Sequence, residues 1–352
     1  MKLMLIIGAL GFGGAERVIC NLANYFSKQN MEVTLISIRN REPVYELDPN
    51  INFINGVDRS NKLLEILALR KLMKRHQPKI IISFLTQINI AVIFASIGLK
   101  SKVIVSERSN PYLFPTNKMI RFLRNVSYKF SNGFVFQTDD ARNHFSKKIK
   151  EKSVVIPNPV DIDSNLTISK KKEKTIVTVG RLIPAKNMDL LIDAFHEVCK
   201  YNDTYNLKIY GDGPELLELN KKIINLGINH KAEILKSNKN ILTEISESEI
   251  FVLTSNSEGM PNSLMEAMSI GLACISTDCP VGGPRSLIED GINGFLIPVN
   301  SKDDLVEKLM YIIQNDEKRN EISSNAKTIR ETHSINKIGM SWLDYVKEVD
   351  TL

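Results

Sequence analysis

Short apolar runs alternate with amphipathic segments along the first half of the chain. Runs of this length, separated by residues at helical spacing, are typical of buried strands in a parallel sheet whose two faces are covered by helices. The runs lie at residues 2–10, 32–38, 79–85, 102–107 and 132–138. The pattern therefore predicts an α/β domain with a parallel sheet.

The second half repeats this alternation after a polar stretch, residues 164–174, that has no apolar periodicity. Its predicted strands lie at residues 175–180, 207–211, 232–235, 250–255 and 273–277. We expect two doubly wound, Rossmann-like lobes facing a cleft, with ligands outside the carboxyl ends of the strands. The predicted domains are residues 1–165 and 166–334, and a C-terminal helix at 335–352 is free to pack back on the N-terminal domain.

The composition is that of an ordinary folded protein. The 352 residues are 43% hydrophobic and 24% charged, which excludes disordered and collagen-like chains. The four cysteines form no CxxC pair and no zinc-like cluster, so we expect a reduced, metal-free, cytoplasmic protein. The longest apolar stretch, residues 88–99, is too short to span a bilayer.

The first 165 residues carry the excess of positive charge, concentrated in two amphipathic segments at residues 61–76 and 117–130. In the second segment, apolar residues share one helical face and basic residues lie across from it. Two interpretations stay open: a core-packed helix with a solvated basic side, or docking on an anionic membrane surface. No nucleic-acid recognition motif is present. The apolar set is Met119, Phe122, Leu123, Val126 and Phe130, and the basic set is Lys118, Arg121, Arg124 and Lys129.

Glycines follow the first predicted strand of each half. Gly13 and Gly14 open a helix, where glycine lets the backbone approach a ligand and free N–H groups suit phosphate. The same sequence is also typical of a simple tight turn without a ligand. A dinucleotide site also needs an acidic residue after the second strand, and residues 34–40 supply none, so NAD is disfavoured. In the second half, Arg181 and Lys186 can converge on one diphosphate or form a solvated cationic loop.

The strongest constellation is residues 257–268, which follow a predicted strand and start a helix near Pro261. Glu258 lies in the loop and Glu266 in the helix, so two carboxylates reach one cleft from different depths. Carboxylates accept hydrogen bonds from sugar hydroxyls, and amides at a helix N-terminus suit phosphate. Taken alone, either glutamate could equally be an ordinary residue on the surface of a helix or loop.

These motifs together resemble the family 4 retaining glycosyltransferases of the GT-B fold. The resemblance covers nearly the whole chain and is densest over residues 154–299. It rests on GGAER, IPNPVD, VGRLIPAKNMDLLIDAF, IYGDGPE, the Glu258 and Glu266 pair, and SIGLACISTDCPVGGPRSLIEDGINGFLIP.

The resemblance implies a role for each matching residue. Arg181 and Lys186 would clamp the diphosphate of a UDP-sugar, and Glu266 would hold the ribose. The base would lie near residues 208–213 and 235–238. No metal or other cofactor is implied, because protein cations would neutralise the leaving group. The other implied donor contacts are Glu258, Gly259, Met260, Pro261, Asn262 and Ser263, with Gly13 and Gly14 from the first lobe.

One departure from the family concerns the first lobe. Many members carry a histidine beside the donor sugar, where this chain has residues 106–111, and none of its five histidines lies there. Glu107 or Arg108 could contact the sugar or the acceptor instead, or the two could form a salt bridge at the end of a strand.

The sequence therefore predicts a retaining transferase that moves a hexose or N-acetylhexosamine from a UDP-sugar to a growing glycan. A glycan or undecaprenyl-diphosphate-linked acceptor in surface polysaccharide biosynthesis would place the enzyme peripherally on the inner face of the cell membrane. The alternatives are a UDP-sugar epimerase and a non-catalytic subunit that binds sugar nucleotides.

Overall fold

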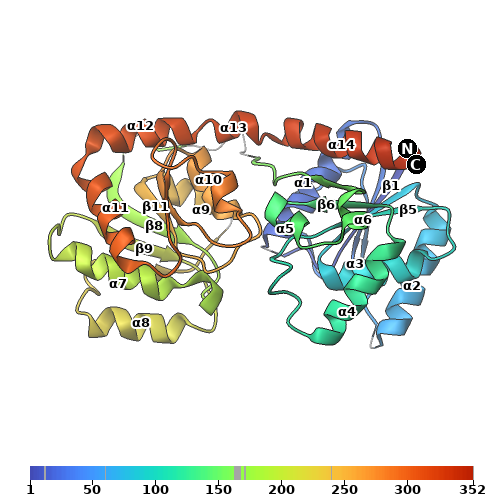
Figure 1. Cartoon of the computed structure of the whole chain (residues 1–352), viewed down its shortest axis with the longest axis horizontal. Coiled ribbons are helices and arrows are strands. Elements are labelled where there is room, and N and C mark those ends of the chain that lie inside the picture. Colours follow the sequence, from blue (N-terminus) through green and yellow to red (C-terminus); the bar gives the residue numbers. More distant parts are fainter. Residues whose placement is uncertain (12, 60, 162–167, 170–171, 239, 352) are drawn as a thin grey trace. The chain divides into compact units, whose positions relative to one another are not determined.

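The computed structural model describes residues 1–11, 13–59, 61–161, 168–169, 172–238 and 240–351, and it divides into two compact units (Figure 1). Unit 1 comprises Met1–Pro159 and His333–Leu352, and unit 2 comprises Val160–Thr332. The boundary predicted at residues 164–174 includes positions 164–167 and 170–171, which lie outside the described residues.

Unit 1 contains a sheet of seven parallel strands in the order β3-β2-β1-β4-β5-β6-β7. The central strands are buried on both faces, as their continuous apolar sequences predict. β3 and β7, which the apolar pattern does not predict, are short, partly buried edge strands. The strands are β1 (Lys2–Ile7), β2 (Glu32–Ser37), β3 (Asn52–Asn55), β4 (Ile80–Phe84), β5 (Lys102–Ser106), β6 (Gly133–Phe136) and β7 (Ser153–Val155).

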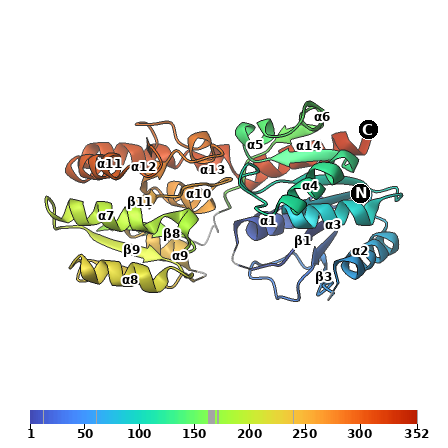
Figure 2. The same ribbon diagram turned by 60° about the horizontal axis from the view of Figure 1, so that its bottom comes forward.

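Helices cover both faces of this sheet. The first and last helices of the chain pack together on one face, and α2, α3 and α4 form a layer on the other (Figures 1 and 2). The helices of unit 1 are α1 (Gly14–Lys28), α2 (Lys62–His76), α3 (Thr86–Ser96), α4 (Lys118–Ser127), α5 (Asp139–Asn143), α6 (Lys147–Lys150) and α14 (Ile335–Thr351), with a 3-10 turn, η1, at Tyr128–Phe130.

The C-terminal helix α14 is an integral part of unit 1. Trp342 is fully buried, and its ring lies 6.0 Å from that of Phe84 between centroids. A Cβ atom at Gly339 would lie 2.6 Å from the ring of Tyr25, so only glycine allows α14 to approach α1 this closely. The Tyr345 hydroxyl also donates to the backbone carbonyl of Lys152 at 2.6 Å.

Unit 2 contains six parallel strands in the order β10-β9-β8-β11-β12-β13, again with helices on both faces. The prediction of two doubly wound α/β lobes is confirmed. The strands are β8 (Glu173–Val179), β9 (Asn206–Tyr210), β10 (Ala232–Leu235), β11 (Ser248–Leu253), β12 (Ala273–Thr277) and β13 (Phe295–Ile297). The helices are η2 (Pro184–Lys186), α7 (Met188–Cys199), α8 (Leu216–Asn225), α9 (Ile241–Ile245), α10 (Asn262–Ser269), η3 (Pro284–Ser286), α11 (Lys302–Gln314), α12 (Asp316–Ala326) and α13 (Ile329–Thr332).

The orientation of α4 agrees only in part with the interpretation of a core-packed helix with a solvated basic side, since Lys118 and Lys129 are exposed as expected but other residues are not placed so. Arg124 is fully buried, whereas Met119 and Phe122 are exposed. The helix packs through the side that carries Arg124, because this guanidinium finds backbone carbonyl partners inside unit 1. Across the described residues, we find no helix with the length and hydropathy of a membrane span.

Candidate functional site

The strand order of unit 2 defines where its ligand site should lie. From β8 the chain builds outward to β9 and β10, and it then returns to the other side of β8 to build β11, β12 and β13. The carboxyl ends of β8 and β11 therefore form the topological switch point, where open α/β sheets bind ligands. Arg181 and Lys186 follow β8, and Glu258 follows β11, so three predicted residues lie at this edge.

Lys186 and Glu258 form an ion pair at the switch point. The ammonium donates to Oε1 of Glu258, and the two side chains are only 18% and 12% exposed. The Ser255 hydroxyl donates to the same carboxylate oxygen at 2.6 Å, and the Thr254 hydroxyl donates to the carbonyl of Lys186 at 3.0 Å. Both charged groups are thus fixed by neighbours. Ser255 is not among the residues predicted from the sequence, although it stands three positions before Glu258.

Arg181 differs from Lys186 in its surroundings. Its side chain is exposed and makes no hydrogen bond or ion pair with the residues that the structure describes. The loop that carries it packs closely on the end of β9, because a Cβ atom at Gly211 would lie 2.0 Å from the carbonyl oxygen of Gly180. Arg181 is therefore a cation on a firmly packed loop, with its donors available to a ligand.

The loop that carries Glu258 is also held in place. The amide of Glu258 donates to the carbonyl of Pro280 at 2.8 Å, and its carbonyl accepts from the amide of Val281 at 2.9 Å. A Cβ atom at Gly283 would lie 2.2 Å from the carbonyl oxygen of Gly259, so the two loops pack together without space for a side chain. This contact gives a physical reason for the GGP sequence at residues 282–284.

Helix α10 begins directly after this loop. Met260 and Pro261 are buried, so the first turn, which includes Asn262 and Ser263, is anchored to the interior of unit 2. Its N-terminal amides point along a helix axis that favours an anion at this end. Glu266 lies in the next turn and is partly buried. The candidate donor residues of unit 2 thus come from the loop after β8, the loop after β11 and the start of α10, at one edge of the sheet.

The glycine loop of unit 1 is shaped for close approach. Gly13 is the N-cap of α1, and Gly14 is its first residue. A Cβ atom at Gly13 would lie 2.0 Å from the carboxylate of Glu16, which therefore covers this helix N-terminus. A negative charge there opposes phosphate binding by repulsion, and this position suits a neutral sugar better than a diphosphate.

Glu107 lies in the interior of unit 1, at the end of β5. Its carboxylate accepts hydrogen bonds from the hydroxyls of Thr86, at 3.1 Å, and Tyr128. Burial raises the pKa of Glu107, opposed by the hydrogen bonds and by the nearby charge of Arg124. The position is 2% exposed, so its geometry supports an internal role. Glu107 and Arg108 do not form a salt bridge with each other.

Arg108 occupies an aromatic and amide setting. Its guanidinium lies 4.1 Å from the ring centroid of Phe84 and 5.7 Å from that of Trp342, and Nη1 donates to Oδ1 of Asn158 at 2.7 Å. Gln137 donates to the same oxygen at 2.8 Å. Nε and Nη2 of Arg108 are buried without a partner in the described part of the chain, and burial lowers its pKa to about 9. The residue as a whole is half-buried, and the two donors that the described residues do not use suit an incoming polar group.

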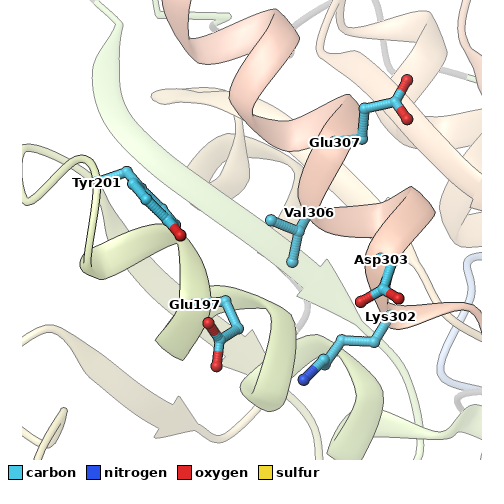
Figure 3. Close-up of a pocket in the computed structure, with 6 residues that line it drawn as sticks. All are labelled: Glu197, Tyr201, Lys302, Asp303, Val306 and Glu307. Carbon is cyan, nitrogen blue, oxygen red and sulfur yellow. The ribbon is translucent and has the colours of Figure 1, made fainter.

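Other features of the structure do not contribute to this site. A shallow hollow between the end of α7 and the start of α11 contains none of the predicted residues (Figure 3). Within the described residues, no three His, Cys, Asp or Glu side chains gather as a metal site. Burial raises the pKa of the Cys279 thiol near Glu258 to about 12, which keeps it protonated and unreactive.

Comparison with known proteins identifies the same two parts. The family model described as Glycosyltransferase Family 4 matches residues 12–164, and the one described as Glycosyl transferases group 1 matches residues 161–329. A Campylobacter jejuni protein named GalNAc-alpha-(1->4)-GalNAc-alpha-(1->3)-diNAcBac-PP-undecaprenol alpha-1,4-N-acetyl-D-galactosaminyltransferase is 31% identical, over 99% of each chain.

Two further proteins are similar over almost the full length. The amylovoran biosynthesis glycosyltransferase AmsD of Erwinia amylovora is 27% identical, over 92% of this chain and 93% of its own. The crystal structure of Anabaena HepE in complex with UDP-glucose shares the fold, with a TM-score of 0.83 and 18% identity over 100% of both chains. The two matching family models and the full-length relatives show that this chain belongs to the family 4 glycosyltransferases and has the GT-B fold.

Proposed function

We propose that this glycosyltransferase transfers a hexose or N-acetylhexosamine from a UDP-sugar, with retention of configuration, to a growing glycan carried on undecaprenyl diphosphate. The name of the Campylobacter jejuni relative specifies an undecaprenol-linked acceptor, and the name of AmsD specifies exopolysaccharide synthesis. HepE was solved with UDP-glucose. These similarities support a surface polysaccharide pathway at the cytoplasmic face of a membrane.

The observation that carries this proposal is the grouping of Arg181, Lys186 and Glu258 at the switch point of unit 2. An ammonium group has three donors, so Lys186 can keep its bond to Glu258 and still donate to a diphosphate. Arg181 adds a planar, two-pronged donor, and the N-terminus of α10 adds backbone amides. Glu258 would then accept hydrogen bonds from the donor sugar.

These groups would lower the barrier by stabilising the leaving group. The bond between the anomeric carbon and the diphosphate oxygen breaks, and the acceptor hydroxyl oxygen bonds to the same face of that carbon. The hydroxyl proton leaves with the departing diphosphate, so the products are the glycoside and UDP. We propose that this charge is neutralised by protein groups without a metal ion, with Gly13, Gly14 and Arg108 of unit 1 contacting the sugar or the acceptor. One preorganised donor is worth about 3 kcal/mol in such a role.

The test is a panel of UDP-sugars assayed for UDP release with and without an undecaprenyl-diphosphate-linked acceptor, with and without EDTA. We expect acceptor-dependent release from one donor, unaffected by EDTA, and an α-linked product by NMR when the donor is α-linked. An inverted linkage would contradict retention. Free epimerised UDP-sugar in the absence of acceptor would instead identify an epimerase, and nucleotide binding without turnover would identify a non-catalytic subunit.

A further inference from the structure

A cluster of large apolar side chains is exposed on one short stretch of unit 1. Tyr112, Leu113 and Phe114 lie in the loop before α4, and Met119 and Phe122 lie on α4 itself, where they are 65% and 62% exposed. Scattered exposed apolar residues are common, but five within eleven positions form a patch that needs an explanation. We name these five residues the α4 patch.

Two arginines fasten the loop of the α4 patch to its helix. Arg121 donates to the carbonyl of Leu113 at 3.2 Å, and Arg124 donates to the carbonyls of Pro111 and Phe114, both at 3.2 Å. The helix begins at its own cap, because Asn117 accepts from the amide of Met119 at 2.9 Å. The loop and the helix are therefore tied together, and the exposed side chains belong to one fixed surface. These hydrogen bonds occupy several of the donors of both guanidinium groups.

The α4 patch lies within a strongly basic segment of the chain, which ends where Asp139 and Asp140 begin α5. Residues 59–138 contain 14 Lys and Arg but only two acidic residues, Glu65 and Glu107. Both are 2% exposed, so the described surface of this segment presents no carboxylate side chain. Lys118 and Lys129, at the two ends of the α4 region, are exposed. Helix α2, in the same layer of helices, adds exposed leucines at positions 63, 64 and 67 (Figures 1 and 2).

We infer that the α4 patch inserts into the interfacial zone of an anionic bilayer, with Lys118 and Lys129 at the lipid headgroups. Exposed aromatic and aliphatic side chains in a mainly basic segment match the chemistry of an interfacial anchor. The tyrosine supplies an apolar ring with a polar tip, which suits the boundary between headgroups and acyl chains. This inference rests on the proposed function in one respect: a lipid-linked acceptor gives the enzyme a reason to lie on a membrane.

The experiment is flotation of the full chain with vesicles of phosphatidylcholine alone or mixed with phosphatidylglycerol, without donor or acceptor. The wild type should float with the mixed vesicles at low salt. The double variant Leu113→Asp/Phe122→Asp should lose about tenfold or more of this partitioning, because two insertions are replaced by charges. Lys118→Glu/Lys129→Glu should lose binding chiefly at low salt.

A matched control comes from unit 2. Leu217 and Ile224 on α8 are 72% and 64% exposed, so Leu217→Asp/Ile224→Asp makes the same change on a similarly exposed apolar pair. We expect this control to float like the wild type. If Leu113→Asp/Phe122→Asp lowers the melting temperature, the milder Leu113→Ser/Met119→Ser variant gives the same comparison in a folded protein.

Two results would overturn the inference. The first is equal flotation of the wild type and the α4 patch variants. The second is a wild type that does not bind vesicles but forms a dimer that the variants lose, measured by analytical ultracentrifugation, since the patch would then bind a second copy. Flotation needs no turnover, so it stands apart from the enzymatic assay. The α4 patch variants should keep their transferase activity toward a short-chain acceptor in detergent, because that assay needs no membrane docking.

Discussion

Lys186 and Glu258 are 72 positions apart in sequence, yet the ammonium of one donates to the carboxylate of the other. The contact joins the loop after β8 to the loop after β11 across the switch point of the sheet. Each charge therefore sets the position of the other before any ligand binds, and the pair has both a structural and a functional role that variants can separate.

Removal of one partner should affect stability and activity together. Lys186→Met leaves the Glu258 carboxylate without its counter-ion, and we expect a loss of about 2 kcal/mol in unfolding free energy, below the value for fully buried pairs because some water remains in contact. Transfer should fall about 100-fold or more, since a diphosphate donor is lost as well. Urea denaturation and UDP-release assays measure the two effects.

The double variant Lys186→Met/Glu258→Gln separates these roles. It removes both charges, so most of the stability should return, while activity should stay as low as in the single variants. Equal stability losses in the double variant and in Lys186→Met would argue against a coupled pair. Recovery of activity would show that neither residue touches the donor.

Arg181→Ala should change activity alone. The side chain is exposed and has no partner among the described residues, so the unfolding free energy should change by less than about 0.5 kcal/mol. The rate at saturating donor should fall about 100-fold or more, because a leaving-group donor is absent in the transition state. Lys221→Ala, an exposed cation on α8, is the control. Normal turnover by Arg181→Ala would remove this residue from the diphosphate clamp.

The central strands and the carboxyl-edge position of the site residues follow from the sequence, because apolar runs and glycine loops are local signals, whereas the short edge strands β3 and β7 do not. The pairing of Lys186 with Glu258 does not, since spacing in the chain carries no information about which loops meet in a doubly wound sheet. The hydrophobic pattern also does not predict which side of α4 packs against unit 1. Arg124 lies inside because carbonyls of residues 111 and 114, placed by the loop, satisfy it. A helical projection of the sequence shows only the residues of the helix itself, so it cannot show that loop carbonyls accept hydrogen bonds from Arg124.

Arg108→Met tests the unpaired guanidinium. Methionine fills the space beside Phe84 and Trp342, and it removes a charged group whose Nε and Nη2 are buried without a partner, which is costly to desolvate. We therefore expect unchanged or higher stability with a raised KM for the acceptor or the donor. A loss of stability with normal kinetics would instead assign Arg108 to holding Asn158.

Glu107→Gln tests the buried carboxyl through its pH dependence. Burial raises its pKa above the ordinary 4.5, so the folded protein binds this proton more tightly than the unfolded chain does. Between these two pKa values the folded state holds more protons, and its stability must fall as pH rises. The free energy of unfolding of the wild type should therefore decline relative to Glu107→Gln as pH increases above 4.5, and the difference between the two proteins should be constant below it. Urea titrations of both proteins from pH 4 to pH 8, with Glu151→Gln as an exposed control, measure this difference. A wild type that gains on the variant with rising pH would show that the hydrogen bonds from Thr86 and Tyr128 outweigh the burial of the charge.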